Sequence, residues 1–219
     1  MADQENIGLF TLTSIAVLDF PHLFEAKAFK RNGKESGEPK FGANFIIPQD
    51  HPDLANLKAT MARVAKAKWP SRSLGELKFP LTAGDKLADK RKAKAGKDDA
   101  DHMRGKLVLT ARSKFPPALG GRENGKDVDY DTEIKKSQAK TKFYSGCEVL
   151  AQFNFVAYEG GTGPDGVTAY LQMVYTFNRG AKIAGAGRSA AETFRGYTGT
   201  ATEEDPTGGW EQAGDEIPF

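Results

Sequence analysis

The chain contains few of the residues that bind metals or form disulfides. It has one cysteine, Cys147, and three histidines among 219 residues. A single cysteine excludes an internal disulfide, and Cys147 lies in an apolar, strand-like stretch, so we expect a buried thiol in a reducing compartment. The histidines are far apart, and no Cys/His cluster has the spacing of a zinc site. We therefore expect neither a metal nor another cofactor.

Long apolar runs are absent as well. No stretch approaches the length that spans a membrane, and the first ten residues lack the basic and apolar regions of a secretory signal. The glycine-rich stretches 160–166 and 180–187 lack the Gly-Lys-Ser/Thr ending of a phosphate-binding loop, so we expect no ATP site. These absences predict a cytoplasmic protein that does not contact membranes, and the sequence gives no sign of an enzyme.

Basic residues are missing from the last part of the chain. Residues 201–219 contain no lysine or arginine, whereas six of the chain's 29 acidic residues lie there. The 31 basic residues therefore all fall in residues 1–200, which carry a net charge of about +8. Residues 201–219 have too little apolar surface to offset the entropy of ordering a chain. We expect a basic domain over residues 1–200, followed by a disordered acidic tail.

The tail ends in an unusual combination of acidic and apolar side chains. Its last residues are Asp215, Glu216, Ile217, Pro218 and Phe219. A flexible tether with an apolar end is typical of a segment that folds on binding a partner. The ending resembles the tip of bacterial single-stranded DNA-binding proteins, in which an acidic run precedes Ile-Pro-Phe. The resemblance implies that the tip recruits replication or repair proteins and that the acidic run competes with DNA; the alternative is a solvated tail with a chance ending.

Alternating apolar residues predict about five strands. The first covers residues 7–18, with an extension over 23–29, and an Asn-Gly turn leads into a returning strand at 40–47. A third strand covers residues 106–114. The clearest hairpin joins residues 147–157 to 167–177. In its second strand we expect these side chains to point inward: Val167, Leu171, Met173, Tyr175 and Phe177.

One amphipathic helix is expected between the second and third strands. Asp50 can cap it, Pro52 fits its first turn, and Leu54, Leu57, Met61 and Val64 form the apolar stripe. The charged residues 84–105 and the polar residues 118–142 are expected to be long loops. The pattern predicts a mainly β protein with an OB-fold-like, five-stranded antiparallel barrel, and it also fits a small sandwich.

Three segments of this predicted barrel resemble a phage-borne family of OB-fold single-stranded DNA-binding proteins. They are residues 41–48, 104–112 and 144–147. The resemblance implies sequence-independent binding and protection of single-stranded DNA during phage DNA replication, recombination or repair. It also implies that the protein acts in the cytoplasm of the host bacterium.

Binding single strands without reading their sequence requires cations that follow the backbone and aromatic faces for the bases. The outward side of the third predicted strand provides cations, Phe115 follows it, and outward tyrosines lie on the hairpin. Alternate phenylalanines such as Phe41 are more typical of a core, and a solvated basic face is the plainer interpretation of the lysines and arginines. The candidate DNA-binding residues are Lys40, Phe41, Lys106, Arg112, Lys114, Phe115, Lys142, Tyr144, Tyr158 and Tyr170.

Two other functions stay open. Asp127, Asp129 and Asp131 suggest a metal-dependent nuclease, but they lie in a predicted loop, and Thr132 and Gln138 depart from a calcium loop. A strand-annealing recombinase would share the binding face, and the sequence does not separate it from a passive binder. We expect single-stranded DNA and, through the tail, replication or repair proteins as partners. The oligomeric state, including a homodimer, is left open.

Overall fold

The computed structural model describes residues 7–31, 34–95, 100–161 and 163–183. Two predictions fall outside these residues: the disorder of residues 201–219 and the domain boundary at residue 200. Within the described residues, no helix is long and apolar enough to cross a membrane.

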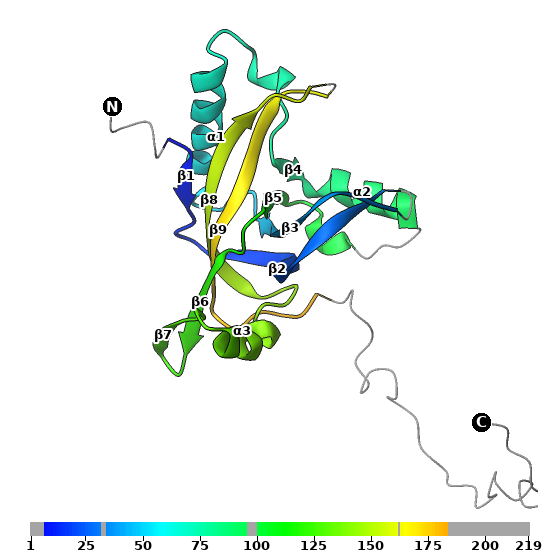
Figure 1. The fold of residues 1–219 in the computed structure, drawn as a ribbon. Coiled ribbons are helices and arrows are strands. Elements are labelled where there is room, and N and C mark those ends of the chain that lie inside the picture. The colour runs from blue at the N-terminus through cyan, green and yellow to red at the C-terminus, as the bar shows by residue number, and fades with distance from the viewer. Residues whose placement is uncertain (1–6, 32–33, 96–99, 162, 184–219) are drawn as a thin grey trace, which may run out of the picture. The chain divides into compact units, whose positions relative to one another are not determined.

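Five strands form a closed barrel, and Figure 1 shows how they are arranged. They are linked in the order β8-β2-β3-β5-β9, and β9 returns to β8. This order confirms the OB-fold-like barrel. The strands are β2 (Ala16–Arg31), β3 (Lys34–Ile47), β5 (Leu107–Ser113), β8 (Glu148–Tyr158) and β9 (Gly166–Thr176).

One seam of the barrel departs from the predicted antiparallel arrangement. β5 and β9 run parallel, and Ala111 lies opposite Ala169. The physical reason is the odd number of strands: directions cannot alternate all the way around a closed ring of five. At least one pairing must therefore be parallel.

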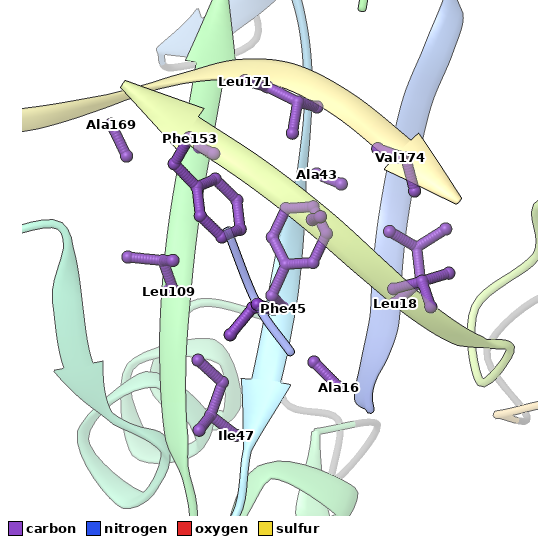
Figure 2. Packing of buried hydrophobic residues seen from close by; sticks show 14 of the residues in the cluster. Ala16, Leu18, Ala43, Phe45, Ile47, Leu109, Phe153, Ala169, Leu171 and Val174 are labelled. Atoms are coloured by element: carbon purple, nitrogen blue, oxygen red, sulfur yellow. The ribbon is translucent and has the colours of Figure 1, made fainter. Parts of the chain in front are cut away.

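The barrel interior is filled by apolar side chains from all five strands, and Figure 2 shows them pointing toward one another. The rings of Phe45 and Phe153 meet edge to face with centroids 4.9 Å apart. The helix α1 (Leu54–Lys68) buries the predicted stripe and packs against β8, β9 and a short strand β1 (Leu9–Thr11). Trp69 ends this helix and packs against the core. The alternating pattern of the strands was therefore a sound guide to the core.

The predicted first strand is in fact divided in two. β1 pairs with β8, and the chain then leaves the sheet before β2 begins. The residues at this break, Thr13 and Ser14, contact Asp53. The Asp53 carboxylate accepts hydrogen bonds from the Thr13 backbone at 2.8 Å, the Thr13 hydroxyl at 2.6 Å and the Ser14 backbone at 2.8 Å. The prediction that Asp50 caps α1 is wrong. Asp53 occupies the N-cap position, and its side chain holds the N-terminal segment instead of the helix.

The loop predicted for residues 84–105 is wrong. These residues form α2 (Gly84–Ala95) and η2 (Asp101–Met103). Two short elements precede them, η1 (Leu74–Glu76) and β4 (Leu81–Ala83). Buried Ala88 and Met103 pack against Ile46 and Val108 on the outside of the barrel. This contact is too small to give a periodic apolar pattern, so the helix was missed.

Residues 118–142 are also structured, against the prediction. β6 (Ala118–Glu123) pairs in parallel with β9 and antiparallel with β7 (Lys126–Asp129). α3 (Glu133–Ala139) and η3 (Lys140–Lys142) follow. Leu119 and Tyr130 are buried in the main core. Leu119 is an isolated large apolar residue without a periodic pattern around it, so the sequence does not mark β6 as a strand. Pairing of β6 with β9 makes the segment an extension of the sheet.

Met173 lies on the surface, contrary to the prediction that it points inward. Val167 and Leu171 are buried as expected, but Met173 is 45% exposed and Val174 is fully buried. The register between β8 and β9 shifts at this point: Gln152 lies opposite Met173, and Phe153 lies opposite Leu171. The shift adds one residue to β9 and reverses the alternation beyond it.

Candidate nucleic-acid interface

The outer surface of β3 and β5 changes character along the strands. Ala43 and Phe45 of β3 and Leu109 and Ala111 of β5 are buried in the barrel. The residues that alternate with them along each strand therefore face outward. We call the surface formed by the outward residues of β3, β5 and β9 the outer face. It is basic at one end, polar with small side chains in the middle and apolar at the other end. Its cross-strand pairs are Gly42 with Arg112, Asn44 with Thr110 and Ile46 with Val108.

Arg112 stands at the basic end of the outer face without an acidic partner. Its guanidinium is half buried and donates to the carbonyl of Ala111 at 3.0 Å, and no described carboxylate pairs with it. A Cβ at Gly42 would approach Arg112 Cδ to 2.7 Å, so the glycine makes room for this side chain. Burial lowers the pKa of Arg112. A desolvated cation without a counter-charge is unfavourable, which makes this position suited to an external anion.

Exposed apolar side chains lie next to Arg112. Because Ala111 pairs with Ala169 in parallel, Arg112 and Tyr170 are lateral neighbours on the outer face. The connection from β5 to β6 leaves β9 at Ala169 and rejoins it where Ala118 lies opposite Met173. Phe115 lies in this connection and is 78% exposed, while Tyr170 is 39% exposed. Both rings are therefore accessible to a ligand.

Further cations surround the same end. Lys114 Nζ lies 2.6 Å from Glu38 Oε2 in an exposed pair, which lowers the pKa of Glu38. Such a pair is weak and exchanges easily for another anion. Lys27 and Lys40 are exposed and lie directly opposite each other in the β2–β3 hairpin, an unfavourable like-charge pair. The local field is positive.

The pKa of His22 is affected by this positive field. His22 lies opposite Gly42 on β2. Its pKa is lowered by burial and, to a smaller degree, by the positive charges of Lys27 and Arg112. Sequence reasoning missed both Lys27 and His22, because their position beside Arg112 depends on strand register. The Asn-Gly turn predicts that the two strands pair, but it does not predict the register that brings these residues together.

Five of the ten candidate DNA-binding residues gather around the basic end: Lys40, Arg112, Lys114, Phe115 and Tyr170. Phe41 is half buried opposite Ser113, next to them on β3. Lys106 does not join the group, because it precedes β5 at the apolar end and donates to the carbonyl of His102 at 2.9 Å.

The remaining three candidates have other structural contacts. Lys142 pairs with Glu123 and lies 5.2 Å from the centroid of the Tyr130 ring. Tyr144 packs against the main core and donates to the carbonyl of Gly180 at 2.9 Å. Tyr158 is half buried at the far end of the β8–β9 hairpin, opposite Gly166. The sequence placed these side chains in plausible segments but could not show what they contact.

The three aspartates of the rival nuclease interpretation lie on β7 and just after it. Asp127 accepts from Tyr175 and pairs with Arg122 at 3.2 Å, and these contacts lower its pKa. Asp131 pairs with Lys135 at 2.8 Å. Within the described residues, no three His, Cys, Asp or Glu side chains are grouped so that they could hold a metal ion.

A closed five-stranded barrel with a basic, partly aromatic outer face defines an OB-type nucleic-acid-binding protein. The comparison with protein families is more specific: residues 11–207 match the family described as "Enterobacter phage Enc34, ssDNA-binding protein". The chain belongs to this family. No curated protein matches the sequence significantly.

Solved structures show the same fold. The single-stranded DNA-binding protein from bacteriophage Enc34 in complex with ssDNA is 18% identical, with a TM-score of 0.58 over 80% of this chain and 88% of that one. A second structure of the same phage protein is 16% identical, with a TM-score of 0.58 over 85% of this chain and 90% of that one. Its C-terminally truncated form is 18% identical, with a TM-score of 0.56 over 80% and 88%.

Proposed function

We propose that the protein binds single-stranded DNA without reading its sequence, at the basic end of the outer face. Bases stack on Phe115 and Tyr170, and phosphates contact Arg112, Lys114 and Lys40. The observation that carries this proposal is the half-buried guanidinium of Arg112, which has no described acidic partner and lies beside exposed aromatic rings. A cation next to a stacking platform is what sequence-tolerant single-strand binding requires.

The family supports a role in phage DNA replication, recombination or repair in the host cytoplasm. We propose that this role is binding and not catalysis. The contacts of Asp127 with Arg122 and Tyr175, and of Asp131 with Lys135, support this proposal because they occupy the carboxylates that a nuclease would need for metals.

A titration with fluorescent single- and double-stranded oligonucleotides at two salt concentrations tests the binding function. We expect preference for the single strand and a decrease of log K with log salt of about 0.7 per neutralised phosphate. Equal affinity for the duplex, or affinity that does not change with salt, would refute the proposal. Gel analysis of the same samples with Mg²⁺ added would reveal strand cleavage if the protein were a nuclease.

We also propose that residues 201–219 form a separate acidic tail with two roles. Its six acidic residues compete with DNA for the basic domain, and Asp215, Glu216, Ile217, Pro218 and Phe219 recruit a replication or repair protein. A tethered competitor acts at an effective concentration near millimolar. Deletion of residues 201–219 should therefore tighten DNA binding, most clearly at low salt.

A Phe219→Ala variant separates the two roles of the tail. It keeps all six acidic side chains, so its DNA affinity should equal that of the parent. Pull-downs from host lysate should lose the recruited protein, since an apolar anchor residue of the motif is missing. Identical bound proteins for parent and variant would contradict the recruiting role.

A further inference from the structure

The helix α2 lies on the same outer face as the candidate site, at its other end. Ala88 of α2 packs in one cluster with Ile46 and Val108, the apolar pair of the outer face. Val108 and Arg112 both point outward from β5 and are four residues apart, which is about 13 Å along a strand. Figure 1 shows α2 beside the β2–β3 hairpin. A strand bound at Arg112 needs only to continue along β3 and β5 to reach α2.

The acidic residues of α2 are engaged in holding the helix in place. Asp89 pairs with Arg104 at 2.8 Å, and the carboxylate of Asp85 accepts from the backbone of Gly105 at 3.4 Å. Arg91 lies 4.2 Å from the centroid of the Phe20 ring, which belongs to the same apolar cluster. Both acids thus contact the segment that follows η2.

Two lysines of the helix differ from these acids. Lys86 and Lys90 are exposed and lie one turn apart, and no described side chain neutralises either of them. The outer face between Arg112 and the apolar pair carries the small side chains of Gly42, Asn44 and Thr110. Lys86 and Lys90 lie on the side of α2 opposite buried Ala88, so a strand that follows this face has to pass over the helix to reach them.

We propose that Lys86 and Lys90 form a second contact for the backbone of the same DNA strand. The strand runs from Phe115 and Tyr170 across the small-residue middle of the outer face to α2. This inference rests on the proposed function and extends its site to a helix that the sequence pattern placed in a loop. Charge complementarity and continuity with the Arg112 site identify the ligand as single-stranded nucleic acid backbone.

The test compares two double variants on short and long oligonucleotides. Lys86→Gln with Lys90→Gln removes the proposed contact, and Lys58→Gln with Lys68→Gln removes two exposed charges from α1 as the matched control. Oligothymidines of about four and about sixteen nucleotides bracket the usual site sizes of an OB fold. The α2 variant should lower the salt slope for the long oligonucleotide by about 1.4 and leave the short one unchanged. The α1 variant should match the parent on both.

Two outcomes would contradict the second contact. The α2 variant could bind the long oligonucleotide as the parent and the α1 control do, or it could weaken the binding of both lengths equally. Circular dichroism and melting check that the variant folds, and Lys90→Arg, which keeps the charge, should retain parental binding. If the parent itself binds neither oligonucleotide, the proposed function fails. If the parent binds both and only the length dependence is missing, the inference on α2 fails alone.

Discussion

Phe115 gives the sharpest test of the proposed DNA site, because its exposure separates binding from stability. The side chain is 78% exposed, so the Phe115→Ala variant removes almost no buried surface. Its free energy of unfolding should stay within about 0.5 kcal/mol of the parent value. If a base stacks on the ring, truncation should weaken single-strand binding by about 1–3 kcal/mol. This corresponds to an affinity loss of roughly 5- to 150-fold.

The salt dependence distinguishes stacking from charge effects. Fluorescence anisotropy with a labelled oligothymidine at low and high salt should show the same fold loss for Phe115→Ala at both concentrations, because the ring carries no charge. Ile134 supplies the matched control: it is 74% exposed on α3, and Ile134→Ala should bind as the parent does. A folded Phe115→Ala variant within twofold of the parent, or a loss that vanishes at high salt, would refute the stacking role.

The other predictions concern the charged groups. Arg112→Gln should lower the salt slope by about 0.7, and melting should show no loss of stability because an unpaired, half-buried charge is removed. The pKa of His22 is held below its ordinary value by burial, Lys27 and Arg112, so a bound phosphate should favour protonation; affinity should rise as the pH falls through the range in which His22 gains its proton. His22→Gln should flatten this dependence in a titration series, and an equally steep profile would exclude His22. Replacing Asp127, Asp129 and Asp131 with Asn should leave DNA binding intact, and loss of a Mg²⁺-dependent cleavage activity in that variant would overturn the binding-only proposal.

The barrel strands could be predicted from the sequence because their signal is local. Phe153 stands between Gln152 and Asn154, and Phe45 falls in step with Ala43 and Ile47; this period of two places both rings on the buried face of a sheet. The stripe of α1 was visible for the same reason. Arg112 and Tyr170 could be assigned to the outer surface, since their neighbours Ala111 and Ala169 are apolar.

Elements whose signal depends on distant contacts were not predictable. Ala88 is an ordinary alanine in a charged stretch, and only its contact with Ile46 and Val108 distinguishes α2 from a loop. Met173 was expected in the core because a bulge, which leaves no trace in composition, reverses the alternation of β9. Asp53 had no assigned role because its partners Thr13 and Ser14 lie about forty residues earlier in the chain.

The sequence by itself determined the mainly β barrel, the excess of basic residues before residue 201 and the resemblance to single-stranded DNA-binding proteins, because alternation, charge and motifs are written along the chain. Only the tertiary structure decided which cations and rings act together. The parallel β5–β9 seam sets Tyr170 beside Arg112, and the β2–β3 register sets Lys27 opposite Lys40. Lys142 and Tyr144 do not join this group of cations and rings, because Lys142 pairs with Glu123 and Tyr144 packs against the main core. Which residues become neighbours depends on strand pairing between distant segments, and that choice is made by the whole fold.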